Sequence, residues 1–124
     1  MKIPGILIAA PASGSGKTSV SCALMAALQA RGLQVRACKC GPDYIDPMFH
    51  REVLGVDSRN LDLFFSEPDE LRQGFIRHAS GADIVVTEGV MGYYDGRGMD
   101  TDAGSSYDVA RTLNLPVILV INCR

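Results

Sequence analysis

Four short apolar runs divide the chain, at residues 3–9, 33–38, 82–89 and 116–122. Each run is apolar without strict alternation and too short for a typical helix, so each predicts a buried strand. Strands that are apolar on both faces are typical of a parallel sheet that helices cover on both sides. The hydrophobic pattern therefore predicts an α/β fold.

The segments between the apolar runs have the spacing and the end signals of helices. Residues 19–32 place apolar side chains at helical intervals and finish on Gly32, a common helix stop. Residues 66–80 begin at Ser66, a good N-cap, with acidic residues in the first turn and basic residues in the last. Residues 105–115 predict another helix. Because strand and helix alternate, we expect a doubly wound, mainly parallel sheet with helices on both faces.

The last predicted strand, residues 116–122, has no helix after it to cover the sheet. A doubly wound domain normally continues, so we expect residues 1–124 to be the N-terminal part of a longer domain, truncated after its fourth strand. Incomplete coverage leaves an edge or a face of the sheet open. That predicts self-association, and we expect a homodimer.

Composition narrows the functional classes. The 124 residues suit one domain, and 47% apolar with 21% charged residues indicates a packed core. The net charge of −2 gives no electrostatic case for a nucleic-acid partner or an anionic membrane. No apolar stretch approaches the roughly 18 to 20 residues that span a bilayer, so we expect a cytoplasmic protein.

The cysteines and histidines predict neither disulfides nor a zinc centre. A cytoplasmic chain keeps its thiols reduced, and a structural zinc site needs four convergent ligands. The sequence offers one C-x-C pair, two cysteines in apolar surroundings and two isolated histidines: Cys38 and Cys40, Cys22 and Cys123, His50 and His78.

A glycine-rich segment lies between the first predicted strand and the first predicted helix. This context is typical of a P-loop, in which glycines let successive N–H groups face a phosphate at a helix N-terminus. Its lysine can reach the β- and γ-phosphates, and its threonine hydroxyl can bind Mg²⁺. The strict motif begins with glycine where this chain has Pro11. The predicted nucleotide-binding residues are Ser13, Gly14, Ser15, Gly16, Lys17 and Thr18.

An acidic residue at the end of a neighbouring strand completes the magnesium site of P-loop proteins. Glu88 ends the third predicted strand, at the edge of the sheet where ligands bind in this fold class. We therefore expect Glu88 to be a magnesium ligand. A solvated carboxylate at a strand end is the alternative interpretation.

The stretch "CKCGPDYIDPMFH" follows the second predicted strand and so emerges at the same edge. Prolines restrict its backbone on both sides of Asp43 and Asp46. A carboxylate held there can bind Mg²⁺, and Lys39 can neutralise phosphate charge. A turn with Asx-type hydrogen bonds is the alternative interpretation.

Five segments closely resemble the cobyrinic acid a,c-diamide synthase family, in its dethiobiotin synthetase-like ATP-binding domain. They are, in order, "SGSGKT", "KCGPDYIDPMFH", "SRNLD", "TEGVMGYYDG" and "GSSYDVAR". "GPDYIDP" and "EGVMGYYDG" are the specific motifs, and the resemblance covers nearly the whole chain. It implies a P-loop NTPase-type fold and an ATP-dependent amidoligase. Such enzymes phosphorylate the a and c side-chain carboxylates of a corrin precursor, and ammonia from glutamine then attacks the acyl phosphate.

The same resemblance implies cofactors, partners and roles for individual residues. ATP and Mg²⁺ are the implied cofactors, with Thr18, Asp46 and Glu88 as magnesium ligands. Asp43 and Asp95 would serve the substrate end of the reaction. The implied partners are a tetrapyrrole carboxylate and glutamine or ammonia. The family's C-terminal glutaminase domain is absent from this chain, so none of the four cysteines is assigned its nucleophilic role.

Three alternatives stay open at this point. A dethiobiotin synthetase-like ligase has a similar phosphate loop and helix, although the two specific motifs favour the corrin enzyme. A partitioning ATPase carries an additional lysine at the start of the loop, where this chain has Ala12. The chain could also bind nucleotide without turning it over. The sequence does not distinguish cobyrinic acid, hydrogenobyrinic acid and a nickel sirohydrochlorin as substrates.

Overall fold

Strands and helices alternate along the chain, as the hydrophobic pattern predicts. The computed structural model describes residues 4–11, 16–40, 45–61, 67–89 and 105–121. The strands are β1 (Gly5–Ala9), β2 (Val35–Cys40), β3 (Asp57–Leu61), β4 (Ile84–Glu88) and β5 (Val117–Leu119). The helices are α1 (Lys17–Ala30), α2 (Ile45–Leu54), α3 (Pro68–Ala79) and α4 (Ser106–Leu113).

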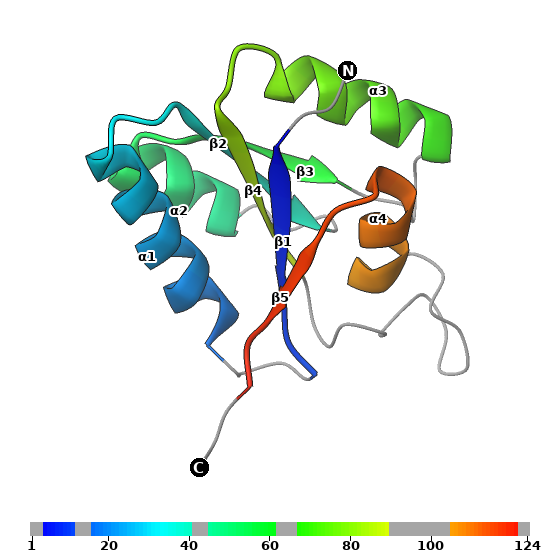
Figure 1. Ribbon diagram of the computed structural model, residues 1–124, viewed down its shortest axis with the longest axis horizontal. Coiled ribbons are helices and arrows are strands. Elements are labelled where there is room, and N and C mark those ends of the chain that lie inside the picture. Colours follow the sequence, from blue (N-terminus) through cyan, green and yellow to red (C-terminus); the bar gives the residue numbers. More distant parts are fainter. Residues whose placement is uncertain (1–3, 12–15, 41–44, 62–66, 90–104, 122–124) are drawn as a thin grey trace.

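All five strands form one parallel sheet in the order β3-β2-β4-β1-β5. Figure 1 shows this twisted sheet at the centre of the molecule, with α1 and α2 on one side and α3 and α4 on the other. β4 lies between β1 and β2, although both of these precede it in sequence. The carboxyl ends of distant segments therefore meet at one edge, and the doubly wound α/β prediction is confirmed.

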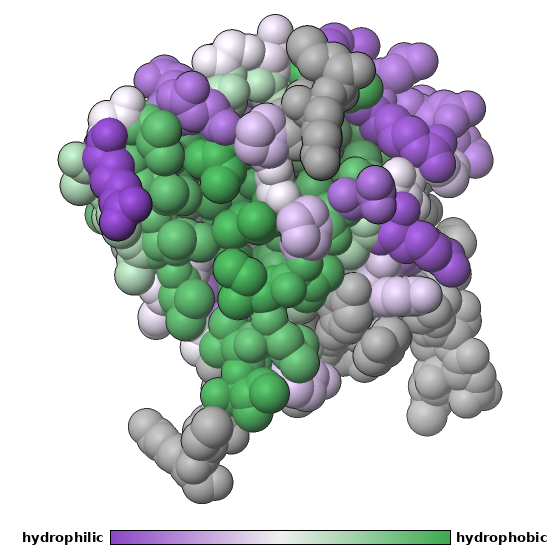
Figure 2. Space-filling view, in the orientation of Figure 1, coloured by the Kyte–Doolittle hydropathy of each residue, from purple (hydrophilic) through white to green (hydrophobic). Residues whose placement is uncertain are grey.

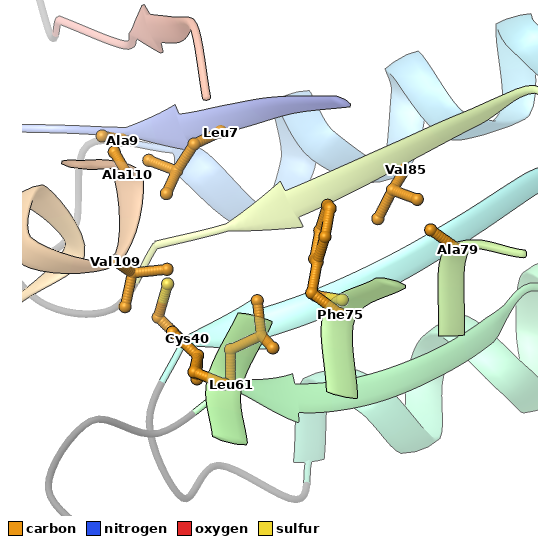
Figure 3. Packing of buried hydrophobic residues seen from close by; sticks show 11 residues of the cluster. Leu7, Ala9, Cys40, Leu61, Phe75, Ala79, Val85, Val109 and Ala110 are labelled. Atoms are coloured by element: carbon orange, nitrogen blue, oxygen red, sulfur yellow. The ribbon is translucent and has the colours of Figure 1, made fainter. Parts of the chain in front are cut away.

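Each face of the sheet carries its own hydrophobic core. On the α1 side, Ile8 and Val86 of the sheet pack with Met25 of the helix. On the other side, Figure 3 shows Phe75 of α3 and Val109 of α4 among the side chains of the strands. Burial on both faces explains why the central strands are continuous apolar runs in the sequence.

Strand β3 is an addition to the four strands that the sequence predicts. It forms the edge of the sheet next to β2. Ser58 and Leu61 are buried, three positions apart and therefore on opposite faces, whereas Asp57 and Arg59 are exposed. The segment is mostly polar because one of its edges and part of its surface face water. For that reason it lacks the apolar run by which the other strands are recognised.

Helix α2 corrects the prediction that the cysteine-rich stretch continues as a restricted loop through Asp46. The helix begins at Ile45, and Pro47 falls in its first turn. Proline is tolerated there because the first N–H groups of a helix have no intrahelical partner. Pro47 therefore lies in the first turn of a helix instead of closing a turn, whereas Pro42 lies outside the described residues.

The ends of α3 agree with the predicted charge pattern, and its N-cap differs from the prediction. Acidic residues occupy the first turn and basic residues the last. The N-cap is Glu67, which makes no side-chain capping bond, and Pro68 occupies the first helical position. The predicted cap, Ser66, lies outside the described residues. Within the described part of the chain, no helix is both long enough and apolar enough to cross a bilayer.

Strand β5 differs from the central strands because its side chains are exposed. Ile118 and Leu119 are about half exposed, as is Ile121 just beyond the strand. Val20 of α1 is also exposed. Figure 2 shows a continuous apolar surface over α1 and β5. The open part of the sheet that the sequence predicts is therefore this β5 surface.

Candidate functional site

The start of α1 has the backbone geometry of an anion-binding helix N-terminus. Gly16 is its N-cap and has a φ of 91°, a left-handed conformation that side chains rarely adopt. Among the described residues no side chain caps the first turn, and that turn contains no acidic residue. Its N–H groups and the positive end of the helix dipole therefore suit a phosphate. Residues 12–15, which include the predicted Ser13, Gly14 and Ser15, lie outside the described residues.

Lys17 opens α1 and is buried with only 9% of its surface exposed. A lysine side chain at the first position of a helix is usually exposed to solvent, since its ammonium is strongly hydrated. Lys17 is therefore covered by other parts of the protein at the N-terminus of α1. This is where the lysine of a phosphate loop is expected.

An ion pair between Lys39 and Glu88 lies at the carboxyl edge of the sheet. The two residues are direct neighbours in the register of β2 and β4. Lys39 Nζ lies 2.6 Å from Glu88 Oε2 and also donates to the carbonyl oxygen of Gly89 at 3.0 Å. Both side chains are almost completely buried, at 5% and 1% exposure. A buried charge is very unfavourable without a partner, so each side chain stabilises the charged form of the other.

Two hydroxyls from α1 reach the same carboxylate. Thr18 Oγ1 donates to Glu88 Oε2 at 3.3 Å. Ser21 Oγ donates to Glu88 Oε1 in a short hydrogen bond, and it also contacts the carbonyl oxygen of Lys17 at 2.6 Å. Ser21 is fully buried. The glutamate that ends β4 is therefore joined to α1 through one oxygen and to both α1 and β2 through the other.

Thr18 and Glu88 fit the chemistry of a magnesium site. Mg²⁺ prefers hydroxyl, carboxylate and phosphate oxygens, and it keeps several waters. Neighbouring ligands of an octahedral Mg²⁺ lie about 3 Å apart, given metal–oxygen distances of about 2.0 to 2.1 Å. The 3.3 Å between Thr18 Oγ1 and Glu88 Oε2 is close to this spacing. In the described residues, no three or more His, Cys, Asp or Glu side chains gather in a way that could hold a metal ion.

The cysteines of β2 face away from this polar cluster. Cys38 and Cys40 belong to the hydrophobic core on the α3 side. Burial raises the pKa of the Cys38 thiol far above its usual value, and it raises the pKa of Cys40 to about 12. Cys22, Cys38 and Cys40 are thiols without a disulfide, as expected. At neutral pH the two β2 thiols are therefore protonated, the unreactive form of a cysteine.

Several predicted site residues lie outside what the structure describes. Asp43 and Asp95 belong to undescribed segments, and Asp46 lies in α2 but its side chain is not described. Their predicted roles are therefore untested by the geometry. The described part of the site brings together Lys17, Thr18, Lys39 and Glu88, joined by Ser21.

Ser21 is the one member of this cluster that the sequence interpretation does not include. A signal for it exists in the spacing of α1. The buried residues of this helix are Lys17, Ser21 and Met25, four residues apart, so they line one face. A small hydroxyl residue at a core-facing position, one turn after the phosphate-loop lysine, is unusual enough to indicate a polar partner in the sheet.

Curated proteins from three organisms are similar to this chain. A cobyrinate a,c-diamide synthase of Picrophilus torridus is 50% identical over 98% of this chain, and one of Gloeobacter violaceus is 53% identical over 94%. A hydrogenobyrinate a,c-diamide synthase of Streptomyces coelicolor is 49% identical over 97%. The matched regions cover 28%, 26% and 25% of these relatives, so the chain spans about a quarter of their length.

A model of a protein domain family also matches this chain. The model of the CobQ/CobB/MinD/ParA nucleotide binding domain matches residues 6–122, which include the phosphate-loop segment, both lysines of the site and Glu88. The parallel sheet, the uncapped N-terminus of α1 and the acidic residue at the end of β4 agree with a nucleotide-binding domain. The chain therefore belongs to the CobQ/CobB/MinD/ParA nucleotide binding domain family.

Proposed function

We propose that the chain is the nucleotide-binding part of an ATP-dependent ligase that amidates the a and c side-chain carboxylates of cobyrinic acid or a closely related corrinoid. The observation that carries this proposal is the junction of Thr18, Lys39 and Glu88 beside the N-terminus of α1. Relatives named as a,c-diamide synthases, about half identical to this chain, support the substrate class. The activity is a proposal for the whole protein.

The chemistry explains why a nucleotide site is needed. A carboxylate is a poor acceptor for ammonia, because its oxygen would have to leave as oxide. Transfer of the γ-phosphoryl group of ATP to a carboxylate oxygen releases ADP and makes an acyl phosphate, which gives the carboxylate carbon a good leaving group. Ammonia from glutamine then forms the amide and releases phosphate. Catalysis of such a transfer is mainly positioning and neutralisation of charge.

This chain supplies groups for positioning and for neutralisation. The N–H groups at the start of α1 and the ammonium of Lys17 are suited to the β- and γ-phosphates. Lys39 brings a second positive charge to the same edge of the sheet. Thr18 and Glu88 are the residues that would hold Mg²⁺, with Asp46 as a third predicted ligand. When bound, Mg²⁺ would neutralise charge on the phosphates and orient them for in-line transfer.

Other features of the whole protein stay predictions. We expect Asp43 and Asp95 at the substrate end, ammonia from a glutaminase domain outside these residues, and a cytoplasmic location. We also expect a homodimer. Sedimentation of the full-length protein measures its oligomeric state, and a strictly monomeric profile would remove the homodimer.

The first test is a direct assay of the full-length protein. With ATP, Mg²⁺ and glutamine, we expect cobyrinic acid, hydrogenobyrinic acid or a nickel sirohydrochlorin to be converted to its diamide. Lys17→Ala should weaken ATP binding by about tenfold or more, because a charge-assisted contact is lost, and should abolish turnover. Ser19→Ala is a matched control, since Ser19 is exposed on the same helix.

The outcomes separate the proposed activity from its rivals. Amidation of a tetrapyrrole carboxylate supports it. ATP hydrolysis without any amide product favours a regulatory ATPase, and activity on a small diamine substrate favours a dethiobiotin synthetase-like ligase. Calorimetry that finds equal ATP affinity in the wild type and Lys17→Ala would contradict the phosphate-loop assignment.

A second test concerns Asp95, which lies seven positions after Glu88 in a glycine-containing segment. We propose that it orients ammonia or takes a proton as the amide forms. Asp95→Asn should then leave ATP affinity within about twofold, and lower amide formation by about a hundredfold or more, the usual scale for a lost acid–base group. Near-normal diamide production by this variant would leave Asp95 as a turn residue.

A further inference from the structure

The cluster formed by Thr18, Ser21, Lys39 and Glu88 contains a buried hydroxyl, that of Ser21, to which the proposed nucleotide chemistry assigns no role. Ser21 is fully buried in the first two turns of α1, and it is neither a phosphate-loop residue nor a strand-end acid. Its single hydroxyl hydrogen has three acceptors nearby: Glu88 Oε1, the carbonyl oxygen of Lys17 and that of Thr18. A carboxylate is the strongest acceptor of the three, so the hydrogen is directed to Glu88.

The two oxygens of Glu88 have different partners. Oε2 faces Thr18 and Lys39, whereas Oε1 faces Ser21. The last torsion of a glutamate side chain is broad and roughly two-fold, so contacts to one oxygen alone leave the carboxylate free to rotate. A hydrogen bond to the second oxygen removes that freedom. Ser21 therefore keeps Oε2 directed at the Thr18 hydroxyl.

Ser21 also connects α1 to the end of β4. Ser21 lies three and four residues after Thr18 and Lys17, on the same face of α1. Its hydrogen bond ties the end of β4 to the helix whose N-terminus is suited to the phosphates. The position of the carboxylate is thus coupled to the position of α1.

We propose that Ser21 is a positioning residue that orients Glu88 for Mg²⁺. It does not touch the metal or the nucleotide, and it acts through Glu88 Oε1. This inference rests on the proposed function, because it requires that Thr18 and Glu88 hold Mg²⁺ beside the nucleotide. Residues that orient a metal ligand typically contribute about 10- to 100-fold to metal affinity.

The test compares metal affinity with nucleotide affinity in the full-length protein carrying Ser21→Ala. Alanine favours the helix, so α1 should persist. We expect the Mg²⁺ concentration for half-maximal nucleotide binding to rise about tenfold or more, and the affinity for ATP without metal to stay within about twofold. Mn²⁺ bound to the ATP complex, measured by electron paramagnetic resonance, gives a second value that does not depend on turnover.

Two further variants make the result specific. Ser19→Ala removes an exposed hydroxyl from the same helix and should change neither affinity. Ser21→Cys keeps the shape of the side chain, with a larger atom, and supplies a weaker donor, so its metal affinity should lie between those of the wild type and Ser21→Ala. This variant also tests the proposal if Ser21→Ala does not fold.

Each remaining outcome counts against the proposal. Equal losses of ATP affinity with and without metal would make Ser21 a packing contact between α1 and β4. Unchanged metal affinity in both Ser21 variants would overturn the inference and leave the proposed function intact. A wild-type protein that binds ATP equally well with and without Mg²⁺ would overturn both.

Discussion

The two faces of the sheet are chemically opposite at its carboxyl edge. On the α1 side, the neighbouring pair Lys39 and Glu88 is ionic and is surrounded by hydroxyls. On the α3 side, the neighbouring pair Cys38 and Thr87 is neutral and lies against the apolar core. Since successive residues of a strand point to opposite faces, a shift of one residue along the chain separates a charged site from a hydrophobic interior.

This contrast shows which face is built for function. A buried ion pair contributes little net stability, because desolvation of both charges offsets most of their attraction. The α3 face holds its strands without such a pair, using Phe75, Val109 and other apolar side chains. We therefore propose that the charges on the α1 face serve binding of phosphate and metal more than they serve the fold.

The largest effect is expected when one charge of the buried ion pair is removed. Lys39→Met leaves Glu88 buried without its ammonium partner, and the free energy of unfolding should fall by about 3 to 5 kcal/mol. Urea denaturation of the variant and the wild type measures this loss. The surface variant Arg72→Met is the control, because it removes an exposed pair with Asp69 and should cost less than about 1 kcal/mol.

A double variant sharpens this prediction. Lys39→Met combined with Glu88→Leu makes the α1 face apolar like the α3 face, and it should recover most of the stability that Lys39→Met loses. It should also bind no Mg²⁺. If the double variant were less stable than Lys39→Met alone, the view that the charges serve function more than folding would be wrong.

Replacing Gly89 with alanine tests how closely the residue after β4 packs against α4 and β1. A Cβ on Gly89 would lie 2.8 Å from Ser106 Oγ of α4 and 3.0 Å from the carbonyl oxygen of Ile8. Gly89→Ala should therefore destabilise the protein by about 1 to 3 kcal/mol through overpacking. Gly74→Ala in α3 is the matched control, since its Cβ would meet nothing within 4 Å. It should stabilise the helix by roughly 0.5 to 1 kcal/mol. Thermal unfolding shifts of the same sign for both variants would contradict this assignment.

The smallest expected effect is the pH dependence of the α3-side thiols. The pKa of Cys40 is about 12 in the folded chain, and that of Cys38 is also raised, against 9.0 for a free thiol. Their contribution to stability is thus complete below about pH 9 and decreases as the pH rises through 12, because only the unfolded thiols ionise in that window.

Alkylation with iodoacetamide at pH 8, followed by mass spectrometry, should label Cys22 before either β2 thiol. Early labelling of Cys38 or Cys40 would show that the α3 face opens more readily than its packing indicates.

The sequence predicts the parts of the fold where one physical signal dominates. Apolar runs identify the central strands, and charged ends identify α3, because burial and the helix dipole act on composition directly. Strand β3 escapes prediction because an edge strand needs few buried apolar residues, and Leu61 is the buried apolar residue of this one. Helix α2 escapes because a proline before its second turn is indistinguishable from a turn proline in the sequence alone.

The candidate site shows the same division. The loop motif and the strand-end position predict Thr18 and Glu88, whose contact the structure confirms. Sequence reasoning assigns Lys39 to phosphate, whereas in the structure it also pairs with Glu88. That pairing depends on the register of β2 against β4, a tertiary property that no local pattern contains.

The central place of β4 has a consequence for synthesis. About 50 residues separate the end of β2 from the end of β4, which takes several seconds at roughly 5 to 20 residues per second on a ribosome. Until β4 emerges, β1 and β2 lack the strand that pairs with both of them. The candidate site is therefore completed only when β4 has been synthesised. A nascent chain that ends before Glu88 contains the phosphate-loop segment and lacks the acidic residue.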